Sequence, residues 1–236
     1  MDVVFPLLAF GPDGYSFTND GRGSIPKMFR DMKIGSMYVE FLRMDSVNTP
    51  AQLRNLLKNH AIIKVDFTSP YGSTSQNSYD GARINLEAKV QLSDGPYQPS
   101  ELFVKPARYP AESYSTARTF RIDLQEDITL DHLLWVIESN NLQYFSFVVL
   151  DHKYYGCRDF VTQLMCQLYQ QGYTTGTILD TIPRYPELPQ GVTNICQALG
   201  YRYMSHPIGT PYVRLIERGH FDYYERIETA DMPYER

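Results

Sequence analysis

The first half of the chain is dominated by short runs of apolar residues, several of which alternate with polar ones. Residues 83–92 alternate strictly, which predicts a strand with one face toward water. Residues 117–124 alternate in the same way and place Phe120 and Ile122 on one side. Further strands are predicted from the apolar, β-prone runs, which are 37–44, 61–67, 101–105 and 143–150. The pattern predicts a largely antiparallel sheet.

Helical spacing of apolar residues marks three other segments. After Gly156 the apolar positions recur every three or four residues up to Gly172, and they are Cys157, Phe160, Val161, Leu164 and Leu168. Thr129 is a predicted N-cap for a helix over 130–139. A helix opening at Thr49-Pro50 places on one face Leu53, Leu56, Leu57 and His60. The remaining predicted segments are loops at 69–81 and 181–191, a short helix through Cys196, and strands at 201–204 and 212–217.

We therefore expect an α+β fold in which a mostly antiparallel sheet carries a few packed helices, the central one starting at Cys157. With 236 residues, 43% of them hydrophobic, the chain can bury one large core. A single catalytic domain over 1–236 is expected, with 1–35 as a mobile or accessory segment.

The composition indicates in which compartment the protein resides and argues against several kinds of site. No stretch reaches the apolar length of a membrane helix, and the start lacks the features of a signal peptide, so a cytoplasmic protein is expected. The three cysteines, Cys157, Cys166 and Cys196, form no C-x-x-C pair, which argues against a metal site or a disulfide framework. The sequence has no glycine-rich phosphate loop, and no cofactor is expected.

Cys157 is the leading candidate for chemistry. At the first turn of a helix, unpaired N–H groups and the helix dipole favour the thiolate, and Arg158 adds a positive charge. The alternative is a cysteine that simply fills the core. A nucleophilic thiol needs a base. His206, on a later strand and oriented by His220 or Asp222, matches the order of residues in papain-like enzymes, whereas His60 or His152 would give a permuted order.

Charged residues supply two further candidate sets. Two pairs have the spacing Asp-x-x-Glu, namely Asp123 with Glu126 and Asp222 with Glu225, and converging carboxylates serve as acid, base or ammonium ligand. A basic segment brings together Arg22, Lys27, Arg30 and Lys33 in a chain whose net charge is −5. Such a segment is suited to phosphates, although a solvated loop is the alternative interpretation.

One segment carries a resemblance to a known family. The run Tyr155-Gly156-Cys157-Arg158-Asp159-Phe160-Val161, with 101–105 and 114–120, resembles an uncharacterised family of small fungal proteins with a Gly-Cys-Arg-x-aromatic-Val signature. Proteins of this kind are similar to the fungal arginine-containing cyclodipeptide synthases. That resemblance implies an aminoacyltransferase of secondary metabolism whose partners are charged tRNAs, and an Asp-x-x-Glu motif that either carboxylate pair would supply.

The resemblance and the residues together predict one mechanism. Cys157 would take an arginyl group from tRNA as a covalent aminoacyl-enzyme, and a second aminoacyl group would close the diketopiperazine. Asp123, Glu126 and His206 would assist, and the substrate would be bound by Arg158, Asp159, Asp222 and Glu225. The four basic residues would contact tRNA phosphates. Two alternatives stay open, namely an NlpC/P60-like cysteine amidase or acyltransferase using Cys157 and His206, and a non-enzymatic small-ligand binding protein.

Overall fold

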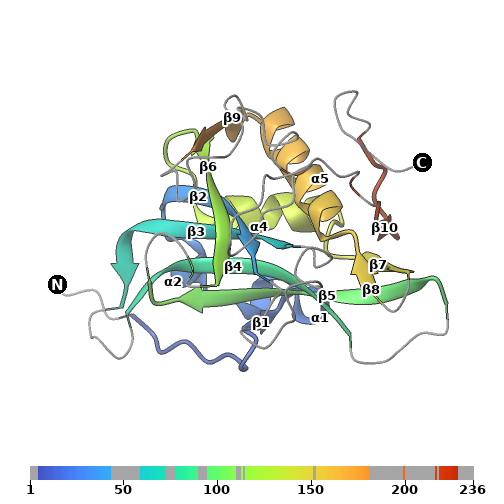
Figure 1. The fold of residues 1–236 in the computed structure, drawn as a ribbon. Helices are drawn as coiled ribbons and strands as arrows, with labels where there is room; N and C mark the ends of the chain where they lie inside the picture. Colours follow the sequence, from blue (N-terminus) through green and yellow to red (C-terminus); the bar gives the residue numbers. More distant parts are fainter. Residues whose placement is uncertain are drawn as a thin grey trace.

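The computed structural model corrects the expected fold class: the protein is predominantly β. Its strands form a curled half-barrel of mostly antiparallel sheet, and short helices accompany it (Figure 1). Only two of the described helices are longer than four residues. The expectation of an α+β fold was wrong because strands such as β3 (His60–Tyr71) and β5 (Tyr97–Ala107) are longer than the sequence pattern indicated, so that the sheet dominates the described residues. The structure describes residues 5–43, 59–72, 78–89, 95–109, 113, 115–150, 153–180, 199, 216 and 218–227.

The main sheet is antiparallel throughout its described ladders. Its order is β10-β7-β5-β4-β3-β2-β6-β9, with β1 added to β5 and β8 added to β7. The strands are β1 (Tyr15–Ser16), β2 (Ile34–Leu42), β3 (His60–Tyr71), β4 (Tyr79–Ala88), β5 (Tyr97–Ala107), β6 (Thr116–Leu124), β7 (Phe145–Leu150), β8 (Lys153–Tyr155), β9 (Thr174–Asp180) and β10 (His220–Phe221).

The helices lie on one side of this sheet. They are α1 (Phe17–Asp20), the 3-10 turn η1 (Arg22–Ser24), α2 (Lys27–Arg30), α4 (Leu130–Ser139) and α5 (Cys157–Gln170). Thr129 caps α4 as expected, since its hydroxyl accepts the His132 N–H while the His132 ring accepts the Thr129 N–H. In Figure 1 the central strands curl beside α4, and α5 runs from β8 toward β9.

The two faces of the central strands differ in polarity. One face is apolar and joins the helices in the core, with Val39, Ile63 and Ile84 as typical members. Residues directly opposite each other in antiparallel strands point to the same side. The other face therefore carries the alternate positions of β3 and β4, including His60, Lys64, Arg83 and Asn85. This polar face positions the candidate site.

The segment before β2 contributes to the same core. Phe17, Ile25 and Phe29 are fully buried, and Tyr15 pairs with Val104 of β5.

The longer predicted elements in the described residues are found, with differences. His60 begins β3 instead of ending a helix, and β3 and β4 reach into the predicted loop 69–81. The elements that were not predicted are β1, α1, η1, α2, β8, β9 and β10. Residues 49–58 of that expected helix lie outside the described residues, as do the loop at 181–191, the helix through Cys196 and the strand at 201–204.

Candidate active site

Helix α5 begins at Cys157, directly after a glycine that the local geometry requires. Gly156 is the N-cap with φ +123°, and a Cβ there would lie 2.8 Å from Cζ of Phe145. No side chain caps the helix at this residue. The first N–H groups of α5 therefore keep the positive end of the helix dipole directed at the space around Cys157.

The start of α5 reaches the beginning of β3, where β3 separates from β4. The ladder between these strands starts at Ile63 opposite Ile84, although β3 itself begins at His60. In this opening the backbone N–H of Ala61 donates to the Cys157 sulfur. The separation of β3 from β4 thus leaves the start of α5 beside the start of β3.

His60 links Cys157 to β4. The thiol of Cys157 and the His60 side chain lie close enough for each to shift the pKa of the other. The other partner of the ring is Asn85, whose Oδ1 lies 2.5 Å from His60 Nε2. Asn85 Nδ2 in turn donates to Glu87 Oε1 at 2.9 Å. Since Asn85 presents its oxygen to the ring, Nε2 carries the proton and Nδ1 is left to accept from the thiol.

The electrostatic surroundings of Cys157 and His60 favour a thiolate–imidazolium pair. Burial by itself raises the pKa of Cys157, but the hydrogen bond and charge of His60, the Ala61 N–H and the nearby Arg158 outweigh it and lower the pKa to about 7. Burial lowers the pKa of His60, yet the hydrogen bond and charge of Cys157, with Asn85 and Glu87, raise it above its ordinary value. Both shifts favour transfer of the proton from sulfur to the ring.

The three residues of the site lie at the edge of the core. Cys157 packs against the core, but it, His60 and Asn85 are each partly exposed, unlike a cysteine sealed in the core. The arrangement of thiol, imidazole and amide matches the roles of nucleophile, base and orienting group in cysteine-dependent acyl transfer. The permuted order, with His60 before Cys157, is the one that the structure supports.

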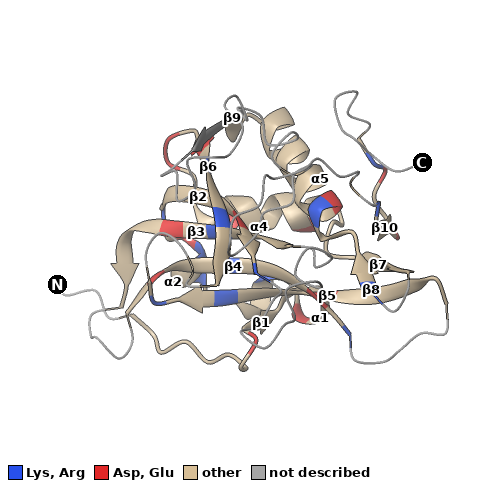
Figure 2. Cartoon of the chain, viewed as in Figure 1, with Lys and Arg blue, Asp and Glu red and all other residues tan. Residues whose placement is uncertain are grey.

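Two residues predicted to bind substrate lie beside Cys157 but have structural partners. The Arg158 guanidinium donates to the carbonyl of Leu199 and lies 5.2 Å from the centre of the Phe41 ring. Asp159 is fully buried, and its carboxylate accepts from the Gly219 N–H at 2.7 Å and pairs with Arg226. Figure 2 shows a basic and an acidic position side by side at the start of α5. Asp159 therefore holds the segment around Gly219 against α5.

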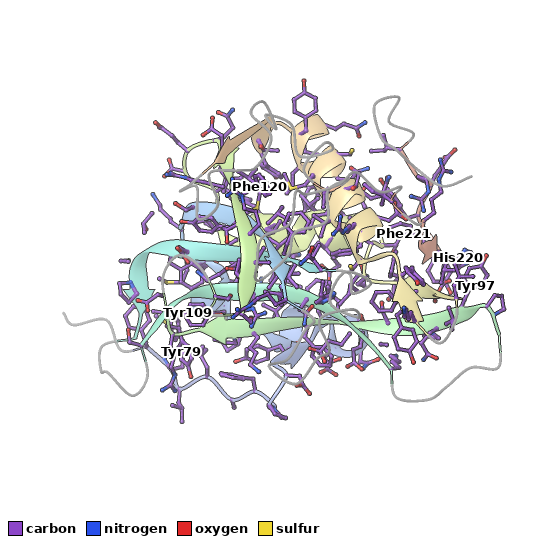
Figure 3. The ribbon with its side chains drawn as sticks, in the orientation of Figure 1. Tyr79, Tyr97, Tyr109, Phe120, His220 and Phe221 are labelled. Atoms are coloured by element: carbon purple, nitrogen blue, oxygen red, sulfur yellow. The ribbon has the colours of Figure 1, made fainter. Side chains whose placement is uncertain are left out.

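The second carboxylate pair lies in that segment, on the surface. Asp222 and Glu225 are exposed, and Asp222 is 3.4 Å from His220 Nε2. The His220 ring stacks on Tyr97, with centroids 4.9 Å apart, as the adjacent labels in Figure 3 show. None of these groups has a recorded contact with Cys157 among the described residues, so the structure does not bring them to the thiol.

The first carboxylate pair lies at the far end of the sheet. Asp123 and Glu126 line a cavity of about 530 Å³ together with Lys33 and Thr68. Thr68 is eight residues beyond His60 on β3, a separation of roughly 26 Å at the usual rise of an extended strand. Asp123 and Glu126 therefore cannot act on a carbonyl held at Cys157, and their expected catalytic role beside the thiol is not supported.

The four basic residues expected to contact phosphates each contact a carboxylate of the protein. The pairs are Arg22 with Asp131 and Glu138, Arg30 with Asp131, Lys27 with Asp31, and Lys33 with Asp127. Their charge is thus partly balanced within the fold. Phosphate binding by this segment stays a prediction.

The remaining expectations concern two histidines, metal binding and membrane helices. His206 and His152 lie outside the described residues. Within the described part of the chain no group of three or more His, Cys, Asp or Glu side chains is arranged to hold a metal ion. No helix in that part is both long and apolar enough to cross a membrane.

Sequence reasoning missed Asn85 and Glu87 and gave His60 only as an alternative. Both missed residues lie on the polar side of the alternating run 83–92, where they look like ordinary solvent-facing positions. One signal could have found them: their strand follows the strand of His60 in the chain, and consecutive strands usually pair in a meander. Polar residues of the second strand are therefore expected beside His60.

Comparison with known proteins places the chain in a family without assigning an activity. No curated protein and no solved structure matches it. Residues 74–221 match a family model described as "Domain of unknown function (DUF7770)", a range that contains Asn85 and Cys157 and begins after His60. Because this range covers more than half of the chain, the protein belongs to the DUF7770 family.

Proposed function

We propose that this protein is a cysteine-dependent acyltransferase in which Cys157 is the nucleophile, His60 the base and Asn85 the residue that orients the base. One observation carries the proposal: at a helix start the Cys157 thiol lies beside the imidazole of His60, and that ring is hydrogen-bonded to the Asn85 amide. A cysteine that merely fills the core needs neither a histidine partner nor a pKa lowered to about 7.

The first half of the reaction forms a thioester. His60 Nδ1 takes the proton from Cys157, and the sulfur attacks the carbonyl carbon of the acyl donor. The oxyanion that forms faces the first N–H groups of α5, which no capping side chain occupies. Collapse breaks the bond to the leaving group, which takes the proton back from the imidazolium.

The second half transfers the acyl group. An amine or a water molecule gives its proton to His60 and attacks the thioester carbonyl; the C–S bond then breaks, and the Cys157 sulfur takes the proton back from the imidazolium. Amine attack makes a peptide or amide bond, whereas water attack makes the protein an amidase or esterase. The hydrogen bond from His60 Nε2 to Asn85 keeps the ring oriented through both halves.

The finer proposal is aminoacyl transfer from charged tRNA, giving an arginine-containing diketopiperazine. It is supported by the resemblance of the residues around Cys157 to the fungal family with the Gly-Cys-Arg-x-aromatic-Val signature, whose members are similar to the arginine-containing cyclodipeptide synthases. In this scheme the aminoacyl ester is the activated donor, and the amine of a second aminoacyl group is the acceptor.

The test is capture of the acyl-enzyme. The purified protein is mixed with a panel of activated esters, including aminoacyl esters, and the Cys157 peptide is examined by mass spectrometry. We expect an added acyl mass that hydroxylamine removes, as it does from a thioester. Cys157→Ala should carry no such label, and a matched Cys166→Ala variant should label normally.

Expression in a bacterial host tests the finer proposal. A cyclic dipeptide containing arginine should accumulate with the wild-type protein and vanish with Cys157→Ala. A Cys157→Ala variant that folds and retains full activity would refute the nucleophile. A wild-type protein that is never acylated by any donor would instead indicate a non-enzymatic binding protein.

A further inference from the structure

Three cations stand in one cross-strand row on the polar face of the sheet. Lys64 of β3 is directly opposite Arg83 of β4, and Arg83 is directly opposite Lys105 of β5. Basic residues on these neighbouring strands can be followed in Figure 2. Like charges placed directly opposite each other destabilise a sheet. Such a row calls for either internal counter-charges or an external anion.

The two outer members of the row have partners within the protein. Lys64 is fully buried, forms an ion pair with Asp66, and lies 5.2 Å from the centre of the Tyr109 ring. Lys105 donates to the carbonyl of Pro12. The ammonium groups of Lys64 and Lys105 thus have partners within the protein.

Arg83 is different. Among the described residues its guanidinium has no hydrogen bond and no ion pair, and its Nε is buried without an acceptor. Arg83 interacts electrostatically with Glu40, but the two carboxylate oxygens of Glu40 accept hydrogen bonds from the backbone and hydroxyl of Ser113. A buried guanidinium nitrogen without an acceptor is costly, unlike the satisfied polar groups typical of native proteins.

Arg83 lies on the same face of the sheet as the residues that contact Cys157. Arg83 and Asn85 are two residues apart on β4 and point to the same face, which separates their Cα atoms by about 7 Å. Asn85 contacts His60, and His60 contacts Cys157. Arg83 is itself partly exposed. A molecule whose carbonyl lies at Cys157 can therefore extend along this face to the guanidinium.

We infer that Arg83 is a specificity residue that binds an oxyanion, carboxylate or phosphate, on the acyl donor. A guanidinium presents a planar fork that matches either group in a bidentate manner. The inference rests on the proposed acyl transfer at Cys157 and adds the chemical class of the donor. It gives the Arg83 guanidinium a hydrogen-bonded counter-ion that the described residues do not supply.

The experiment uses affinity labels that differ only in charge. N-iodoacetyl ω-amino acids of increasing chain length carry a terminal carboxylate, and their primary amides are neutral matched probes. A third set ends in a phosphate instead. The labelling rate of Cys157 is measured by peptide mass spectrometry for each probe, and the ratio of the acid rate to the amide rate is the readout.

At one chain length the wild-type ratio should reach about tenfold, the value expected for a charge-assisted hydrogen bond. In Arg83→Gln the ratio should fall to near one while the rate with the neutral amides is unchanged. Arg83→Lys should give an intermediate ratio. Arg121→Gln, which removes an exposed cation from the same face of β6, is the control and should keep the wild-type ratio.

The outcomes separate this inference from the proposed function. If the neutral amides fail to label Cys157, the proposed nucleophile is wrong. If they label it but every ratio is near one, or if Arg83→Gln keeps the wild-type ratio, the oxyanion site is refuted and the acyl-transfer proposal stands. A larger ratio with the phosphate set than with the carboxylate set identifies a phosphate-bearing donor.

Discussion

Replacing His60 by glutamine tests the origin of the lowered thiol pKa. In the native site the hydrogen bond and charge of His60 are the main causes that bring the pKa of Cys157 down to about 7, against the raising effect of burial. Without the imidazolium these two contributions disappear while the burial of the sulfur remains. The pKa should then rise to at least the ordinary value for a cysteine, about 8.5.

The size of the effect at pH 7 follows from two opposing factors. The thiolate fraction falls from about one half to about 3%, which is roughly a 16-fold loss. Each thiolate becomes about four to six times more nucleophilic, because reactivity rises with basicity with a Brønsted slope of about 0.4 to 0.5. The net rate at pH 7 therefore falls only about threefold, whereas the alkaline plateau rises. The midpoint of the pH profile is the decisive quantity.

The assay is the rate of reaction of Cys157 with a neutral dipyridyl disulfide between pH 5 and pH 10, located on the Cys157 peptide. In the wild type the rate should rise with pH through a midpoint near 7, because the thiolate forms as pH rises through that pKa. The control is His132→Gln, a histidine of the α4 cap that should leave the midpoint unchanged. A His60→Gln profile that coincides with the wild-type profile would refute the pairing of His60 with Cys157.

Three other substitutions test the surroundings of the site. Glu87→Gln keeps an acceptor for Asn85 but removes the negative charge that raises the pKa of His60, so the Cys157 midpoint should rise by less than about one unit in the same titration. Gly156→Ala should lower the free energy of unfolding by about 2 kcal/mol or more in urea denaturation, because it adds a steric clash to positive-φ strain. The matched control is Gly172→Ala, which has the strain without the clash and should lower the free energy of unfolding by about 1 kcal/mol. Asp159→Ala should cost about 3 kcal/mol or more, because it removes the carboxylate that balances the charge of Arg226 in a largely buried site, and an equal cost in Asp159→Asn would count against that reason.

The sequence predicted most of the described elements because their signals are local. Alternation along 117–124 and the cap at Thr129 are properties of a few neighbouring residues, and β6 and α4 begin and end within a residue of the expected bounds. The fold class was mispredicted for the opposite reason. How far a strand extends is decided by its partners across the sheet. β3 ends at Tyr71 and β4 begins at Tyr79, so both reach into a Ser- and Gly-rich segment that reads locally as a loop.

The site was only half predictable for the same reason. Cys157 could be identified because a helix start lowers a thiol pKa through groups that are adjacent in sequence. Its partners could not, because His60 and Asn85 reach it through strand pairing and through the separation of β3 from β4. The apolar spacing of Leu53, Leu56 and Leu57 also drew His60 into a helical pattern, although His60 begins a strand.

The most direct test of the account is the absorbance of the thiolate itself. Its ultraviolet band is titrated with pH in the wild-type protein and in Cys157→Ser, and the difference isolates Cys157. A single step with a midpoint near 7 is the result that the thiolate–imidazolium pair predicts. A step at pH 8.5 or above would show an ordinary thiol and would contradict the assignment of Cys157 and His60 as nucleophile and base.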